Sequence, residues 1–169
     1  VMTAILCILG PLSIPLPFSP VPLSLTNFAI LLAVFLLGWK WGTVSCGIYL
    51  LLGLVGVPVF SGFSGGMAKL LGPTGGYLVG FLLLAVISGL FVEKFEQARL
   101  PVAAGMALGM LVDYLFGTLW LAILMKLSFG QALMMGVVPY LAGDAVKLII
   151  ALLLGSALRR RLQALRILV

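Results

Sequence analysis

Long apolar runs separated by short polar, glycine-rich or proline-rich breaks divide the chain into segments of helix length. Five of these runs are predicted as helices, at residues 23–37, 43–54, 75–92, 102–125 and 137–158. The apolar residues before Pro11 are predicted as the latter part of a further helix that begins upstream of Val1. Apolar runs of about 20 residues are typical of membrane-spanning helices. The pattern predicts an all-α integral membrane protein, a compact bundle of six transmembrane helices forming a single transmembrane domain over residues 1–169.

Two of the breaks have a composition of their own. Residues 11–22 contain five prolines and are predicted as an extended or polyproline-like outer loop, either a simple helix terminator or one wall of a ligand-binding mouth. Residues 56–81 carry seven glycines between Gly56 and Gly76, which favours a shaped, non-helical loop between the third and fourth helices. Such a loop is either a tight connection or a surface that presents backbone groups to a small polar ligand.

Glycines also recur at helical spacing. Gly76 and Gly80 in the fourth predicted helix are four residues apart, as are Gly105 and Gly109 in the fifth. Spacing of this kind lets helix backbones approach closely, so all four are predicted to be packing positions.

Composition narrows the function classes. Hydrophobic residues make up 63% of the chain and charged residues 8%, far from the values of soluble proteins, and the net charge of +6 comes from basic residues at helix ends rather than from a nucleic-acid-binding stripe. The chain has no histidine and no phosphate-binding GxxxxGK[ST] loop, and its two cysteines, Cys7 and Cys46, are predicted to be buried, inert thiols. We therefore expect neither an enzyme nor a resident cofactor or metal.

Lysine and arginine residues predict the orientation in the membrane. If the first helix begins in the cytoplasm, two basic residues lie outside, Lys69 and Lys126. Seven lie inside: Lys40, Lys94, Arg99, Arg159, Arg160, Arg161 and Arg166. This split satisfies the positive-inside rule, so both termini are predicted to be cytoplasmic and the glycine-rich loop external. The polar run Glu93, Lys94, Glu96 and Arg99 is predicted to be solvated.

The sequence GDAVK places two opposite charges inside the last apolar run. Asp144 and Lys147 are three residues apart and therefore share a helix face, roughly 10–15 Å from the outer end of that helix. A charge at that depth costs about 2.5–3.5 kcal/mol on insertion scales, so both must be compensated. Either the two side chains pair with each other inside the bundle, or they line a pocket that opens outward.

The stretch PVFSGFSGGMAKLLGPTGGYLVGF resembles the signature of the BioY family, the biotin-specific substrate-capture subunits of energy-coupling-factor (ECF) transporters. The resemblance continues in PLSIPLPFSPVPLSLTNFAILLAVFLLGWKWG and PYLAGDAVKLIIA, and so spans nearly the whole chain. It implies six transmembrane helices, capture of biotin from outside a prokaryotic cell membrane, and partnership with a transmembrane coupling protein (T component) and two cytosolic ABC ATPases. The alanine pair that such subunits use to dock the coupling protein is represented here only by Ala4.

The resemblance also implies ligand contacts. Asp144 is expected to accept a hydrogen bond from a ureido N–H of biotin and Lys147 to donate one to the ureido oxygen. The residues expected to close over the ligand are Tyr77, Ser64, Gly65, Gly66 and Thr74. Lys69 and Asn27 are weaker candidates, and Asp113 is expected to bond to a neighbouring helix rather than to contact the ligand.

The alternative functions are a self-sufficient, ion-coupled transporter of biotin or another vitamin, with Asp144 or Asp113 as proton site, and, less favoured, a membrane enzyme.

Overall fold

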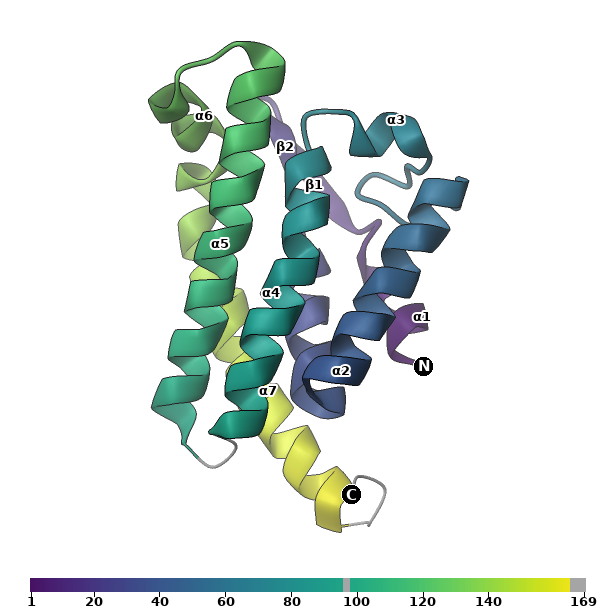
Figure 1. Ribbon diagram of the computed structural model, residues 1–169, viewed down its shortest axis with the longest axis vertical. Coiled ribbons are helices and arrows are strands. Elements are labelled where there is room, and N and C mark those ends of the chain that lie inside the picture. The colour runs from purple at the N-terminus through teal and green to yellow at the C-terminus, as the bar shows by residue number, and fades with distance from the viewer. Residues whose placement is uncertain (96–97, 165–169) are drawn as a thin grey trace.

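The structure, a computed structural model, describes residues 1–95 and 98–164. Its elements are α1 (Met2–Leu9), β1 (Ser13–Leu16), β2 (Ser19–Ser24), α2 (Thr26–Val55), α3 (Met67–Leu70), α4 (Gly75–Lys94), α5 (Arg99–Met125), α6 (Phe129–Gly136), η1 (Val138–Tyr140) and α7 (Leu141–Ala164). The long helices lie side by side, with α3 and α6 at one end of the molecule and the α4–α5 connection and the end of α7 at the other (Figure 1). Glu96 and Arg166, for which the sequence predicted solvation and a cytoplasmic position, lie outside the described residues.

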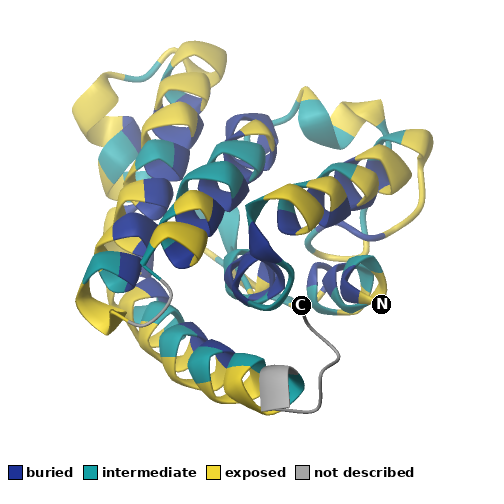
Figure 2. Cartoon of the chain, turned by 60° about the horizontal axis from the view of Figure 1, so that its bottom comes forward, coloured by how far each residue is buried: buried dark blue, intermediate teal, exposed yellow. Residues whose placement is uncertain are grey.

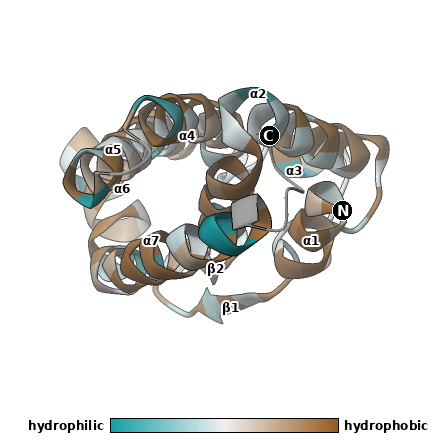
Figure 3. Ribbon diagram, turned by 90° about the horizontal axis from the view of Figure 1, so that it is seen from below, coloured by the Kyte–Doolittle hydropathy of each residue, from teal (hydrophilic) through white to brown (hydrophobic). Residues whose placement is uncertain are grey.

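The helical segments have the length and surface of membrane helices. Within the described residues, four stretches are long and apolar enough to cross a membrane: Thr26–Val55, Gly75–Lys94, Arg99–Met125 and Phe129–Leu162. Their buried residues face one another, and their outward faces are exposed (Figure 2). Large apolar side chains, among them Leu111 and Ile123 of α5 and Ile149 of α7, are more than half exposed on those faces, and hydrophobic residues dominate the helices seen along the bundle (Figure 3). Such surfaces belong in lipid, which agrees with the membrane protein predicted from the sequence.

α2 contains a sharp turn. Residues 23–37 and 43–54 were predicted as separate helices, and the structure has helical residues on both sides of Gly38, whose φ of 76° and ψ of 179° break the helix. The left-handed φ favours glycine, and a Cβ at this position would overlap the Glu93 carboxylate. Glu93 accepts a hydrogen bond from the Trp39 N–H (3.0 Å) and so caps the helix that follows. Glu93 therefore has a structural contact as well as the predicted exposure to solvent.

The proline-rich stretch is a hairpin rather than a polyproline-like loop. β1 and β2 pair in antiparallel orientation, with Ser13 opposite Ser24, Ile14 opposite Leu23 and Leu16 opposite Ser19. None of these paired residues is a proline, so the missing N–H groups fall outside the paired positions, as edge strands allow. The ribbon crosses the bundle near the end where α3 lies (Figure 1).

α4 and α5 pack closely through glycines, as predicted. A Cβ at Gly76 would overlap Trp120, one at Gly80 would overlap Asp113, and one at Gly109 would overlap Ser88. This close approach brings the middle of α5 against the first turns of α4 and so positions the side chains described next.

Two short helices were not predicted. α3 lies inside the glycine-rich loop, which was expected to be non-helical throughout. α6 occupies residues that were assigned partly to a loop, and it begins with a capping box in which Ser128 Oγ accepts from the Gln131 N–H while Gln131 Oε1 accepts from the Ser128 N–H. As a result α7 begins at Leu141, four residues later than predicted.

Candidate functional site

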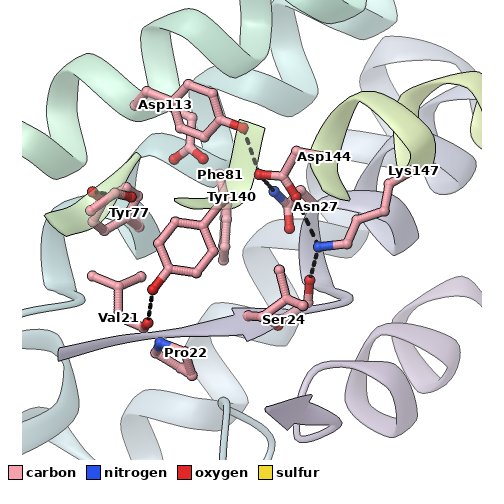
Figure 4. Close-up of a pocket in the computed structure, with 13 residues that line it drawn as sticks. Val21, Pro22, Ser24, Asn27, Tyr77, Phe81, Asp113, Tyr140, Asp144 and Lys147 are labelled. Atoms are coloured by element: carbon pink, nitrogen blue, oxygen red, sulfur yellow. Dashed lines mark hydrogen bonds and ion pairs between the residues drawn. The ribbon is translucent and has the colours of Figure 1, made fainter. Parts of the chain in front are cut away.

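A pocket of about 400 Å³ lies where β2 and the start of α2 meet α4, α5 and the start of α7 (Figure 4). Only about 50 Å³ of it is enclosed cavity, and the rest includes open space at its mouth. Its lining combines apolar and aromatic side chains with a few polar ones: Val21, Pro22, Leu23, Ser24, Asn27, Tyr77, Phe81, Asp113, Tyr114, Gly136, Tyr140, Asp144 and Lys147. The proline-rich hairpin supplies one wall, as the second of its two predicted roles required.

Asp144 and Lys147 form an ion pair at this pocket. Lys147 Nζ lies 2.8 Å from Asp144 Oδ1 and donates a further hydrogen bond to the Ser24 carbonyl at 2.5 Å. The sequence left open whether the two charges pair with each other or line a pocket, and in the structure they do both. Because the pair lies in the first turns of α7 and faces β2, it is buried from lipid and close to the end of the bundle that carries α3 and α6.

Two further donors fix the Asp144 carboxylate. The Tyr114 hydroxyl of α5 donates to Oδ2 at 2.5 Å, and the Asn27 amide of α2 donates to the same oxygen at 3.3 Å. With Lys147 this gives three donors from three helices. Buried charges need such compensation, and each charge-assisted bond also fixes the direction of the carboxylate. Asn27, a weak candidate from the sequence, therefore belongs to the polar cluster.

Side-chain hydroxyl groups link the hairpin and α4 to the segments that precede α7. The Tyr77 hydroxyl donates to the Gly136 carbonyl at 3.0 Å, and the Tyr140 hydroxyl donates to the Val21 carbonyl. Ser19 Oγ on the hairpin donates to the Met135 carbonyl of α6 at 2.8 Å. Tyr77 thus lies at the pocket, as predicted. Its hydroxyl is bonded to the backbone, so the ring is the part of the side chain left to contact a ligand.

The other predicted contact residues lie nearer to the glycine-rich loop. Thr74 lines an adjoining cavity of about 340 Å³, together with Ser61 and Tyr77. Ser64 and Lys69 line an outer cavity of about 650 Å³ that also includes Ser61. Tyr77 lines the first two cavities, Ser61 the last two and Pro22 all three, so the three adjoin one another between the Asp144 cluster and the loop. Burial in the loop lowers the pKa of the Lys69 ammonium below its ordinary value.

Gly65 and Gly66 line none of these three cavities, and the structure gives them a role inside the loop. The Gly66 N–H donates to the Gly53 carbonyl at 2.6 Å, with Gly66 at a φ of 88°. A Cβ at Gly65 would overlap the Val57 carbonyl. Both glycines hold the loop against the end of α2, so the structure does not bring them together with Asp144 and Lys147.

Asp113 is placed differently from the prediction. The sequence assigned it to the other half of the membrane and to a bond with a neighbouring helix, whereas the structure puts its side chain into the lining of the pocket that contains Asp144. Its Oδ1 is buried and has no hydrogen-bond partner among the described residues. The reason for the difference is depth, because the pocket extends inward to the middle of α5, and Gly80 of α4 leaves room for the carboxyl group.

Sequence reasoning missed Tyr114 and Tyr140 as parts of the site. Tyr140 stands four residues before Asp144, a spacing that places two residues on one helix face, and Tyr114 follows the intramembrane Asp113 directly. Both signals were present in the sequence, but neither says which distant side chain the hydroxyl meets. Among the residues that the structure describes, no three cysteine, aspartate or glutamate side chains gather in a way that could hold a metal ion.

The fold and the pocket define a helical integral membrane protein with a small-molecule site near one end of its bundle. Comparison with known proteins gives the family. The sequence model of the BioY family matches residues 1–164. The chain is 39% identical over 160 residues to the biotin transporter BioY of Thermotoga maritima, covering 95% of this chain and 92% of that protein. It is 40% identical over 146 residues to a probable biotin transporter BioY of Pyrococcus horikoshii, covering 86% and 85%.

The fold agrees with these matches. A crystal structure of the S-component for biotin from an ECF-type ABC transporter superposes with a TM-score of 0.87 at 36% sequence identity, covering 94% of this chain and 87% of that one. The chain belongs to the BioY family. The resemblance stated from the sequence is therefore confirmed, and the family consists of transport proteins rather than enzymes.

Proposed function

We propose that this protein is the biotin-binding S component of an ECF-type transporter and captures biotin from outside the cell for uptake. The observation that carries the proposal is the Asp144–Lys147 pair, which lines a pocket in a chain whose relatives are biotin transporters. A cyclic urea presents N–H donors beside one carbonyl acceptor, so a carboxylate and an ammonium side by side are complementary to it.

Binding would exchange partners rather than create unpaired charges. Without ligand, Lys147 donates to Asp144 and to the Ser24 carbonyl. A ureido oxygen can replace the Ser24 carbonyl as acceptor, while a ureido N–H donates to Asp144. Because each charge keeps a partner throughout, the exchange avoids the large penalty of an isolated charge in an apolar environment. The rings of Tyr77 and Phe81 would cover the bicyclic head group.

The three adjoining cavities offer the tail of the ligand a path. From the Asp144 cluster, the apolar chain would pass the cavity lined by Thr74, and its carboxylate would reach the outer cavity lined by Ser64 and Lys69. The backbone at Gly65 and Gly66 would then act indirectly, by shaping the loop that covers the tail. In this arrangement the glycine-rich loop is the external lid of the site.

The proposed topology has six membrane segments within one transmembrane domain: α1, the two parts of α2 on either side of Gly38, α4, α5 and α7. The basic residues at the end of α7 and at the turn of α2 would face the cytoplasm of a prokaryotic cell, with both termini on that side. Transport would require a T component and two cytosolic ATPases, and the protein itself would need no resident cofactor.

Calorimetric titration of biotin into the purified protein tests the proposal. We expect tight one-to-one binding that is lost in Asp144→Asn and in Lys147→Met, each checked for intact folding. Lys94→Met, which removes a lysine at the exposed end of α4, should bind as the native protein does. A folded native protein that does not bind biotin would refute the proposed ligand.

The ion-coupled alternative is separated by a transport assay. The position of Asp113 in the pocket lining favours this alternative, because an intramembrane carboxyl group at a ligand site is where a coupling proton would bind. We expect the protein alone in sealed liposomes to bind biotin without concentrating it, whatever ion gradient is applied. Accumulation driven by a proton or sodium gradient would favour the alternative.

A further inference from the structure

Asp113 is the buried acidic group of the pocket that the binding scheme above leaves unused. Its side chain is 2% exposed, and its Oδ1 has no hydrogen-bond partner among the described residues. Figure 4 shows its carboxyl group directed into the pocket whose opposite side carries Asp144 and Lys147. A buried polar atom without a partner is rare in proteins, and such an atom is commonly satisfied by a water molecule or a ligand.

The contrast with Asp144 is informative. Asp144 receives hydrogen bonds from Lys147, Tyr114 and Asn27, so its carboxylate is already occupied in the empty pocket. Asp113 lines the same pocket, and its carboxyl group has an oxygen without a hydrogen-bond partner among the described residues. If a ligand brings two N–H donors, the first can share Asp144, but the second finds an unoccupied acceptor only at Asp113 among the carboxyl groups of the lining.

The position of Asp113 is built into the helix packing. Gly80 lies so close to Asp113 that a Cβ there would overlap Oδ1 and would also press on the Asp113 backbone. α4 therefore passes this carboxyl group only because it carries a glycine at that point. The same close approach places Oδ1 against the Gly80 backbone and so limits the rotamers open to Asp113.

Charge decides the form in which this carboxyl group acts. Lys147 is the one basic residue in the lining, and it is already paired with Asp144. A second carboxylate would therefore be an uncompensated charge, and a buried carboxyl group in that situation persists as the neutral acid. A neutral acid still presents a carbonyl oxygen as acceptor.

We propose that Asp113 is a second head-group-reading residue, which as a neutral carboxylic acid accepts a hydrogen bond through its carboxyl group from an N–H of the bound cyclic urea. This proposal rests on the proposed function, since it takes biotin as the ligand. It completes the recognition of the ureido group: Lys147 donates to the oxygen, Asp144 accepts from one nitrogen and Asp113 accepts from the other. A site that satisfies every polar atom of a ligand discriminates strongly against analogues that lack one of them.

Affinity measurements with two N-methylated biotins, one methylated at each ureido nitrogen, test the contact. The native protein is compared with Asp113→Leu, which removes the acceptor at similar size, and with Asp113→Asn, which keeps a neutral carbonyl acceptor. We expect Asp113→Leu to weaken biotin binding about tenfold or more and Asp113→Asn to change it by only a few fold. Methylation of the nitrogen that faces Asp113 should weaken binding to the native protein and to Asp113→Asn, but much less to Asp113→Leu.

Ser88→Ala is the matched control. Ser88 also has a buried oxygen without a partner at the α4–α5 interface, but it does not line the pocket. We expect its removal to leave biotin affinity and both methylation penalties unchanged. A similar effect of Ser88→Ala and Asp113→Leu would mean that affinity responds to interface packing alone, which would overturn the proposal.

Infrared difference spectroscopy supplies a second readout, which does not rest on the size of an affinity change. The native protein should show the carbonyl stretch of a protonated carboxylic acid, absent in Asp113→Asn, and biotin should shift that band to lower wavenumber. Native protein that binds biotin tightly but shows no such band, or shows equal methylation penalties with and without Asp113, would overturn this inference while leaving the proposed function intact. Failure of the native protein to bind biotin would instead refute the proposed function.

Discussion

The Asp144 carboxylate illustrates how single residues set the chemistry of this pocket, because its donors come from helices that are far apart in the sequence. Lys147 lies on the same helix, whereas Tyr114 belongs to α5 and Asn27 to α2. The local pair could be predicted from a three-residue spacing. The two distant donors could not, because spacing along one helix carries no information about which faces of other helices meet it.

Tyr114→Phe tests the importance of the shorter of these distant bonds. The change removes the hydroxyl that lies 2.5 Å from Asp144 Oδ2 and keeps the ring. A hydrogen bond to a charged group is worth about 1.5–3 kcal/mol, so we expect biotin affinity to fall by roughly tenfold or more, measured by calorimetry. Unaltered affinity in Tyr114→Phe would contradict the assignment.

Lys69, which lines the outer cavity, allows a test of the proposed contact with the ligand's carboxylate. Lys69→Met should weaken binding of biotin by about two- to fivefold, as for a partly exposed ion pair, but should not weaken binding of the biotin methyl ester, which has no carboxylate. Lys126→Met, which removes an exposed lysine elsewhere on the bundle, should show no such difference between acid and ester.

The pH dependence of binding follows from the lowered pKa of Lys69. A carboxylate beside the ammonium stabilises its charged form, so the pKa is higher in the complex than in the free protein. Affinity for biotin should therefore be greatest below the lowered pKa of the free protein and fall as the pH rises through it. The methyl ester and Lys69→Met should lack this component, and an identical pH profile for acid and ester would exclude Lys69 from the site.

At the scale of elements, apolar run length predicted α4, α5 and most of α7 to within a few residues, since a long apolar helix is dictated by local composition. The β1–β2 hairpin was not predicted, because five prolines argue against strands unless the ribbon leaves them unpaired. α6 was missed although its Ser128–Gln131 capping box is a local signal, since residues 128–131 had been interpreted as a short loop before the last helix. At the turn of Gly38, the helix that follows is capped by Glu93, which lies 54 residues beyond Trp39 in the sequence. Local composition carries no sign of such a contact.

The α4–α5 interface gives a prediction at this scale. Gly80→Ala places a methyl group against Asp113, and overpacking of this kind destabilises by roughly 1–3 kcal/mol. We expect a lower melting temperature in detergent together with weaker biotin binding, because the pocket carboxyl group must move. Gly47→Ala is the matched control, since a Cβ at Gly47 meets nothing within 4 Å and alanine is the better helix former. Equal melting temperatures for the two variants would contradict close packing at Gly80.

The whole molecule shows why the site could be predicted only in part. The pocket forms where β2, the starts of α2 and α7, the first turns of α4 and the middle of α5 converge. Only the GDAVK pair and Tyr77 carried a local signal of chemistry. Asp113 was assigned to the wrong neighbourhood because its depth was estimated from helix length alone, without the cavity that reaches it. Family resemblance supplied the ligand, whereas the geometry of the empty pocket supplied the partners of each polar atom.

The distribution of charge over the molecule makes the last prediction, which concerns orientation. The turn of α2, the α4–α5 connection and the end of α7 lie at one end of the bundle and carry most of the basic residues, while Lys69 and Lys126 lie at the other. With Cys7 and Cys46 replaced by alanine, Lys126→Cys should react with a membrane-impermeant thiol reagent on intact cells, and Arg160→Cys only after the cells are opened. Both positions are exposed, so accessibility within the protein does not limit either reaction. The opposite labelling pattern would turn the pocket toward the cytoplasm, and the protein could not then capture biotin from outside.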